Sequence, residues 1–409
     1  MKFLDSLLGK PTLKSVTEDV AKVLRASGET DLAVNTTEGS VDIRRNGESG
    51  VIVNVHNLLH ELLGAPRAER AAKVRRFLSG VALSKNGTPK KYEDVIALLR
   101  PVVRFEHEFS LHSLQAQVQM GREMEGMCRR PVVNDVVAAL AIDMPDSMSL
   151  VTEESLKEWG VTFEDAFDQA TLNLRGHTEQ DGWKVIQPGV WSGEWGDSYE
   201  SSRILLPDVI HRLGISDPVA MVPFRDSILV TSARDELGLE SMLGIVERAI
   251  ETSNRWISFK PALLQEKAWL PFTPPPALQE RFRRIAITNS SFTYSQQKEL
   301  LDSKFKKESE DVFVATYSVL ETDGKAMSWA MWTKGVSHAL LPITDLVILG
   351  APEEPDLPTL IVPWDRVREL VGHLMLTTEI NPPRFRVREF PSSDEFSKLR
   401  AVASSVLAK

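Results

Sequence analysis

Two short segments, residues 197–203 and 225–226, hold the side chains best suited to chemistry in this sequence. The candidate site residues within them are Asp197, Tyr199, Ser202, Arg203, Arg225 and Asp226. Two arginines can hold an anionic group while a neighbouring carboxylate acts as a base. The same residues can instead form a buried ionic network that only stabilises the fold. Both alternatives stay open, and no residue is assigned a catalytic role.

A segment rich in tryptophan and glycine precedes these residues. Trp183, Trp191 and Trp195 lie close together in the sequence, with Gly189 and Gly193 between them. A loop of this kind can present aromatic faces to a sugar or a cation. Large aromatic side chains more often cover the core of a protein, and we favour that interpretation. Trp191 and Trp195 are nevertheless kept as candidate ligand-binding residues.

Histidines give little support for a metal site. His56 and His60 share a helical face, but the neighbouring glutamate projects away from them by about 100°, unlike that of a His-Glu-x-x-His motif. His107, Glu108 and His112 lie close together at a spacing that fits no standard metal site. Glycine-rich phosphate-binding motifs and the Gly-x-Ser-x-Gly nucleophile motif are absent from the sequence. We therefore expect no metal and no cofactor.

Composition limits the class of protein and its compartment. The 409 residues are 42% hydrophobic and 26% charged, which is ordinary for a soluble globular protein, and the formal net charge is −9. A protein with a negative net charge is repelled by the negatively charged phosphates of nucleic acids, so we expect no nucleic-acid partner. No run approaches the roughly 18 apolar residues of a membrane span, and no signal peptide is recognisable. Cys128 is the single cysteine, so an intrachain disulfide is impossible, and we expect a cytoplasmic protein with no transmembrane segment.

Periodicity predicts an α+β protein of three modules with antiparallel or mixed sheets. The predicted domains are residues 1–83, a small N-terminal α+β domain, then 84–270, and then an additional C-terminal domain at 277–409. The last boundary is placed at the proline run of residues 271–276, because consecutive prolines are stiff and extended.

Several elements are expected to position the candidate site. Strands are predicted over residues 132–144 and 183–191, a helix over 201–213, and a hairpin over 219–224 and 228–231. After the proline run, a strand is predicted over residues 285–288 and a helix over 295–307.

The middle part of the chain resembles the YtpQ-like family of bacterial proteins, which have no assigned activity. The matching residues are Leu99-Arg-Pro-Val-Val-Arg104, Ala141-Ile-Asp-Met144, Trp159-Gly160, Asp197-x-Tyr199-x-Ser-Ser202-Arg203-Ile-Leu205 and Val219-Ala-x-Val222-Pro223-x-x-Asp226. The resemblance covers residues 100–260 and does not reach 277–409. Ser201 stands where a small, alanine-like residue is expected. Since the family carries no established catalytic residues, the resemblance implies none here.

We therefore interpret the chain as a non-catalytic binding or adaptor protein with a protein partner of unknown identity. This hypothesis depends on the modular layout and on the lack of a recognisable catalytic constellation. The alternative is an enzyme with a polar, anion-binding pocket around Asp197, Arg203, Arg225 and Asp226.

Overall fold

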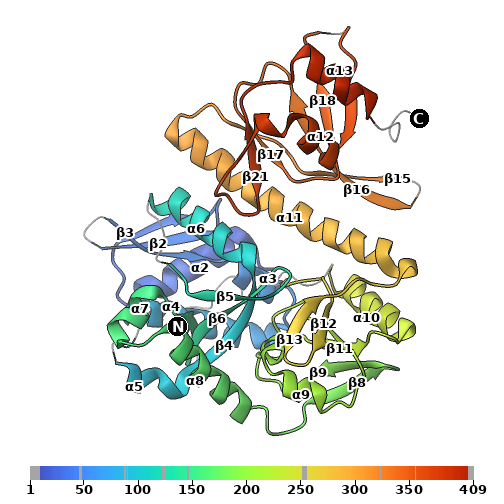
Figure 1. The fold of residues 1–409 in the computed structure, drawn as a ribbon. Helices are drawn as coiled ribbons and strands as arrows, with labels where there is room; N and C mark the ends of the chain where they lie inside the picture. Colours follow the sequence, from blue (N-terminus) through green and yellow to red (C-terminus); the bar gives the residue numbers. More distant parts are fainter. Residues whose placement is uncertain are drawn as a thin grey trace. The chain divides into compact units, whose positions relative to one another are not determined.

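A computed structural model describes residues 10–45, 48–86, 89, 91–121, 126–144, 147–250, 256–322, 324–354 and 356–403. The fold is α+β, with 42% helix, 28% strand and five sheets that are antiparallel or mixed, which confirms the predicted fold class (Figure 1).

Two compact units make up the chain. The first comprises residues 1–101, 126–128 and 140–173, and the second comprises 102–125, 129–139 and 174–409. The predicted division at 1–83, 84–270 and 277–409 stays a prediction.

The first unit contains a small antiparallel sheet covered by helices. The sheet has the order β1 (Leu32–Asn35), β2 (Ser40–Arg45), β3 (Glu48–Asn54). Helix α2 (Leu13–Ala26) begins with a capping box at Thr12 and packs Val16, Val20 and Leu24 into the core beneath the sheet. The other helices with residues in this unit are α3 (His56–Leu63), α4 (Arg67–Asn86), α5 (Tyr92–Val95), η1 (Ile96–Leu98), α7 (Glu153–Trp159) and α8 (Phe163–Gly176).

The division between the units passes through β4 (Leu99–Phe105) and β6 (Val136–Met144). In the first unit, the last part of β6 pairs with β7 (Ser147–Leu150). In the second unit, the first part of β6 pairs with β5 (Arg129–Val133). The second unit also holds α6 (Glu106–Met120), which directly follows β4.

A six-stranded antiparallel sheet forms one half of the second unit. Its order is β13 (Ala268–Pro271), β12 (Ala262–Gln265), β10 (Pro218–Met221), β11 (Leu229–Ser232), β9 (Val190–Gly193), β8 (Trp183–Gln187). Helix α10 (Glu236–Ala249) packs Leu239, Leu243 and Val246 into the core that also contains residues of this sheet. Two short helices, η2 (Ser201–Leu205) and α9 (Pro207–His211), lie between β9 and β10 in the chain.

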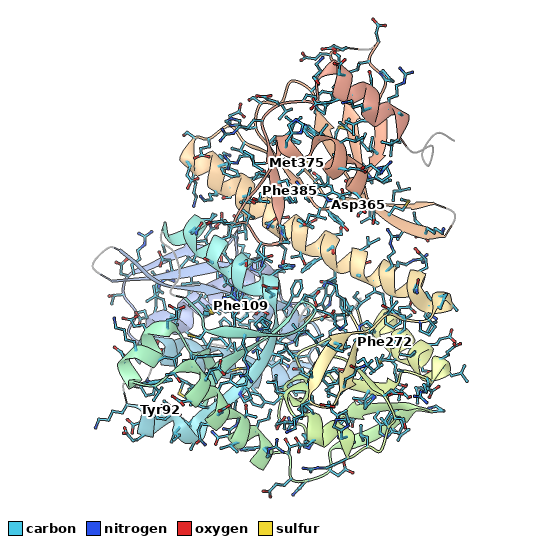
Figure 2. All side chains as sticks on the ribbon, in the orientation of Figure 1. Tyr92, Phe109, Phe272, Asp365, Met375 and Phe385 are labelled. Carbon is cyan, nitrogen blue, oxygen red and sulfur yellow. The ribbon has the colours of Figure 1, made fainter. Side chains whose placement is uncertain are left out.

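Two four-stranded mixed sheets form the C-terminal part of the second unit. One has the order β14 (Phe313–Val314), β17 (Ala339–Pro342), β21 (Arg384–Val387), β20 (Met375–Thr377), and the other β15 (Ser318–Thr322), β16 (Lys325–Thr333), β18 (Leu346–Gly350), β19 (Leu360–Pro363). Helices α12 (Trp364–Val371), η3 (Gly372–Leu374) and α13 (Ser393–Ala401) complete this part. Trp332, Val347, Val367 and Met375 belong to its core, and Phe385 packs against it (Figure 2).

Helix α11 (Pro276–Glu308), drawn in orange in Figure 1, is one continuous helix of 33 residues. The strand predicted over residues 285–288 is therefore wrong. Its β-branched residues favour a strand locally, but Phe282, Ile285 and Asn289 recur at helical spacing and are buried together. Tertiary packing overrides the local preference here.

Three other predicted elements are interrupted. Residues 132–144 form the hairpin β5–β6, because Asn134, with φ of 55°, and Asp135 make a two-residue turn. Residues 183–191 form the hairpin β8–β9 around Gly189, whose φ is 75°. Residues 201–213 form η2 and α9, separated at Leu206, whose φ and ψ of −118° and 73° are not helical. The hairpin predicted over 219–231 is confirmed as β10–β11.

Candidate functional site

Asp197 and Arg203 form a bidentate ion pair inside the second unit. Nη1 of Arg203 donates to Oδ1 of Asp197 at 2.7 Å, and Nη2 donates to Oδ2 at 2.7 Å. The Arg203 side chain is fully buried, and Nη2 also donates to the main-chain oxygen of His177 at 3.3 Å. The backbone N–H of Tyr199 donates to Asp197 at 2.9 Å, which fixes the turn that leads into η2. The pair thus joins residues of one turn to the end of α8.

Opposing effects set the charge on Asp197. Burial acts most strongly and raises the pKa of its carboxyl. The hydrogen bonds from Arg203 and from the Tyr199 N–H, together with the Arg203 charge, outweigh burial and hold the pKa below its ordinary value. Asp197 is therefore ionised at neutral pH.

Arg225 and Asp226 do not join this ion pair. Arg225 forms its ion pair with Glu108 of α6, and the Asp226 side chain is exposed. The two polar segments meet where the Ser201 hydroxyl donates to the main-chain oxygen of Arg225 at 2.6 Å. The single buried network predicted around Asp197, Arg203, Arg225 and Asp226 is thus replaced by two separate ion pairs.

Trp195 belongs to the packing around Arg203. The Arg203 guanidinium carbon lies 4.4 Å from the centre of a Trp195 ring, and Trp183 meets Trp195 edge-on at 5.2 Å. A Cβ atom added at Gly182 or Gly193 would lie within 2.7 Å of the Trp195 ring. These glycines are required because the indole packs directly against their backbone. Trp195 is itself half-buried, so its indole covers the fully buried Arg203 side chain without being part of the core.

Tyr199 and Ser202 belong to the same turn as Asp197, and the Ser202 N–H donates to the Tyr199 main-chain oxygen at 3.0 Å. Tyr199 and Ser202 are buried, whereas Trp191 lies on β9 and is half-buried. Several polar atoms in this region are enclosed and have no hydrogen-bond partner among the described residues: Nε1 of Trp183, Oε2 of Glu200, Nε of Arg203 and Nε of Arg225. Arg203 and Arg225 each keep one N–H group without a hydrogen-bond partner in the parts of the chain that the structure describes. These atoms are enclosed by the protein, so a ligand cannot reach them in this conformation.

A cavity of about 240 Å³ lies elsewhere in the second unit. Helix α11 contributes one face to it, formed by Ala286, Asn289, Ser290, Thr293 and Tyr294, which recur at helical spacing. The opposite lining comes from segments far apart in the sequence: Phe105, His107, Asp135, Phe259 and Lys260, followed by Ile343, Pro382 and Pro383. The cavity therefore exists only once the chain has folded.

Opposite charges lie side by side in the cavity lining. Nζ of Lys260 lies 3.0 Å from Oδ2 of Asp135, and the Ser258 hydroxyl donates to Oδ1 of the same carboxylate. The Asp135 side chain is 11% exposed, whereas that of Lys260 is 52% exposed. The carboxylate is thus held in place, and the ammonium group retains the freedom to move.

Asn289 is the buried polar residue that stands out in the lining. Its relative exposure is 7%, and the Thr293 hydroxyl, one turn further along α11, donates to its main-chain oxygen at 2.8 Å. A carboxamide carries two donors and an acceptor, so Asn289 can hydrogen bond to a polar group placed in the cavity. Together with the ion pair of Asp135 and Lys260, it makes this cavity a candidate binding site.

His107 contributes an uncharged ring to the same cavity. Burial is the main cause that lowers the pKa of His107, and the Lys260 charge acts in the same direction. The carboxylates of Asp135 and Glu106 and a hydrogen bond with Asn381 oppose this shift without outweighing it. The imidazole is therefore neutral at pH 7, and its Nδ1 is enclosed without a partner among the described residues.

A hydrogen-bonded framework holds the proline side of the cavity. The Tyr294 hydroxyl donates to the main-chain oxygen of Pro383 at 2.9 Å, and the Gln297 amide donates to that of Pro382 at 2.7 Å. Burial raises the pKa of Tyr294 to about 12, so its hydroxyl stays protonated. Arg384, which is fully buried, donates to Gln297 at 2.5 Å and so joins the framework to β21.

The sequence did not identify this cavity, although it contained a partial signal. His107 belongs to a histidine–glutamate group whose spacing fits no standard metal site. Asn289, Thr293 and Gln297 are polar residues that repeat at i, i+4 and i+8 between apolar stretches, a buried polar stripe on a helix. The sequence prediction, with a strand over residues 285–288 and a helix only from residue 295, does not place these three residues on one helix.

The described residues show neither a metal-binding cluster nor an activated thiol. They contain no group of three or more His, Cys, Asp or Glu side chains placed to hold a metal ion, and the His60 side chain lies outside them. Burial, followed by the charge of Glu153, raises the pKa of the Cys128 thiol, so it is not an activated nucleophile.

Comparison of the chain with protein-family models, with curated proteins and with solved structures found no match in any of the three. Within the described parts of the chain, no helix has both the length and the apolar character needed to cross a membrane.

Proposed function

We propose that this protein is a non-catalytic binding protein and that the cavity beside α11 is its ligand site. The observation that carries the proposal is the cavity of about 240 Å³, whose lining contains the ion pair of Asp135 and Lys260 together with the polar side chain of Asn289. A few charged and amide groups in a partly apolar cavity are what fix the orientation of a small ligand.

The lining supports binding more than catalysis. Of the lining hydroxyls, that of Thr293 donates to the main-chain oxygen of Asn289 at 2.8 Å, and that of Tyr294 is held in contacts with the main chain. Neither is free to act as an activated nucleophile, which needs a base within reach and access to the substrate. The enzyme alternative around Asp197, Arg203, Arg225 and Asp226 has less support, because its two arginines pair with different carboxylates.

Thermal unfolding in the presence of a chemically broad set of small metabolites tests the proposal. We expect at least one compound to raise the melting temperature of the wild-type protein but not that of Ala286→Leu, which fills the cavity. The matched control is Ala249→Leu, in a different helix of the second unit and outside the cavity lining. If no compound stabilises the wild type, or if Ala286→Leu responds equally, the cavity is not a ligand site.

The predicted protein partner and the cytoplasmic location belong to the same proposal. The single cysteine supports a reducing compartment, and the resemblance of residues 100–260 to the YtpQ-like family, which has no assigned activity, supports a bacterial protein. Cross-linking of the full-length protein in cells, followed by fractionation and mass spectrometry, tests both points. Recovery in the membrane or secreted fraction would contradict the location.

A further inference from the structure

Building on the proposed function, we infer that the ligand of the cavity is a small zwitterion of the free amino acid class. In this arrangement the ligand ammonium lies at Asp135, and the ligand carboxylate lies between Lys260 and the Asn289 carboxamide.

The charged pair in the lining provides the first argument. Asp135 and Lys260 carry opposite charges 3.0 Å apart. A ligand carboxylate alone would compete with Asp135 for Lys260 and bring two negative charges together, and a ligand ammonium alone would repel Lys260. A zwitterion brings a partner for each group and leaves the net charge of the cavity unchanged.

The local fold holds Asp135 in place for such a contact. The Glu106 N–H donates to the main-chain oxygen of Asp135 at 2.9 Å, and the Ser258 hydroxyl donates to its carboxylate. The Asn134 amide also donates to the main-chain oxygen of Pro261 at 3.4 Å, which ties the β5–β6 turn to the segment that carries Lys260. Lys260 itself is half-exposed, so its ammonium can turn from Asp135 towards an arriving carboxylate.

The α11 face of the cavity adds a neutral donor for the ligand carboxylate. Asn289 is 7% exposed and lines the cavity, and its carboxamide supplies N–H donors that a carboxylate accepts.

The size and the walls of the cavity limit the ligand further. A volume of about 240 Å³ lies below the range of roughly 300–1,000 Å³ found for drug-sized ligands. Phe105, Phe259 and Ile343 provide apolar surface for a side chain. A nucleotide is too large for this space, whereas an amino acid with a modest apolar side chain suits it.

Titration calorimetry on the full-length protein with individual proteinogenic L-amino acids tests the inference. Each amino acid that binds is compared with its N-acetyl derivative, which lacks the ammonium, and with its amide, which lacks the carboxylate. We expect the zwitterion to bind, and each derivative to bind about 10- to 100-fold more weakly, the range for one charged hydrogen bond. Lys260→Gln and Asn289→Leu should weaken binding to a similar extent, while Lys267→Gln, at an exposed position outside the lining, should not change it.

The outcomes separate this inference from the proposed function. If a derivative binds as tightly as its parent, or if only non-zwitterionic metabolites stabilise the wild type and not Ala286→Leu, the ligand class is wrong and the binding site stands. If no compound of any class binds in a cavity-dependent manner, both fail. Asp135→Asn serves as a second variant, since it keeps the acceptor for Ser258 while it removes the charge.

Discussion

Buried arginines in the second unit are stabilised in two different ways. Arg203 has a carboxylate partner, Asp197, and packs on Trp195. Arg384 donates only to neutral oxygens, those of Gln297, Ala315, Leu340 and Tyr294. Burial lowers the pKa of Arg384 to about 10, which still leaves it charged at neutral pH. Loss of Asp197 leaves the Arg203 charge without its partner inside the protein. Loss of the Arg384 guanidinium leaves several buried acceptor oxygens unpaired.

Replacing Asp197 with Asn should destabilise the protein by about 3–5 kcal/mol, the cost of leaving a buried charge without its partner. Urea denaturation at pH 7 measures this difference. Asp226→Asn is the matched control, and because Asp226 is exposed we expect a change within about 0.5 kcal/mol.

The effect of Asp197→Asn should depend on pH. The pKa of Asp197 is lower in the folded protein than its unfolded value of about 3.9. Its ionisation therefore contributes stability above about pH 4, and this contribution is lost as the pH falls through the folded pKa. The difference between wild type and variant should shrink on acidification. An undiminished difference at the lowest pH where both proteins still fold would contradict a strong ion pair.

Arg384→Lys should cost about 3 kcal/mol or more, since a lysine cannot reproduce the planar fork and leaves buried acceptors unpaired. Arg386→Lys, two positions further on β21 and only partly buried, is the control, with an expected change of about 0.5 kcal/mol or less. Chemical denaturation compares the two variants. Equal stability of both would show that the Arg384 hydrogen bonds contribute little.

At the level of elements, α11 connects the cores of the second unit. Leu278, Phe282 and Ile285 pack with the core that contains α10, whereas Leu301 and Phe305 pack with β14 and β17. The cavity-lining face lies between these two apolar regions. The helix ends in a Schellman motif, in which Glu310 N–H donates to the Phe305 oxygen at 2.9 Å.

The end of α11 supports a prediction at this scale. Ser309 adopts a left-handed conformation with φ of 56°, which favours glycine. Ser309→Gly should therefore stabilise the protein by about 1 kcal/mol. The same substitution at Ser303, in the helix interior, should destabilise it by about 0.5–1 kcal/mol. Thermal unfolding of both variants gives the signs, and a destabilising Ser309→Gly would contradict the strained cap.

At the level of the whole molecule, each unit is assembled from separate stretches of the chain. Residues 102–125 and 129–139 belong with 174–409 and supply Phe105, His107 and Asp135 to the cavity lining. A fragment that begins at residue 277 therefore lacks part of the lining and part of the core around α11.

The fragment 277–409 should lose protection in the first half of α11. In the full chain, Leu278, Phe282 and Ile285 are buried against residues that precede position 277, so in the fragment they face water. Hydrogen exchange should be fast over residues 278–289 of the fragment and slow there in the full chain. Leu301 and Phe305 keep Val314 and Leu340 as partners within the fragment and lose Leu114 of α6, so residues 297–305 should lose less protection than residues 278–289 and serve as the internal comparison. Equal protection over 278–289 would support the predicted domain boundary at the proline run.

Local sequence patterns determined the elements whose signals lie within a few residues. Helix α2 follows from its capping residue and the spacing of Val16, Val20 and Leu24, and the hairpin β10–β11 follows from two apolar runs with a polar bend. The α+β class and the pairing of Asp197 with Arg203, six residues away, were also within reach of the sequence. The strand assigned to 285–288 was wrong because burial, not local preference, decides a β-branched stretch.

Only the tertiary structure decided which distant side chains meet. Glu108 lies 117 residues from Arg225, and Asp135 lies 123 residues from Ser258, and no local spacing reports such contacts. The sequence predicts a candidate site within residues 197–226. The structure instead favours a cavity whose lining residues extend from Phe105 to Pro383. The physical reason is that a cavity forms where packed elements leave space, and that depends on how the folded chain brings them together.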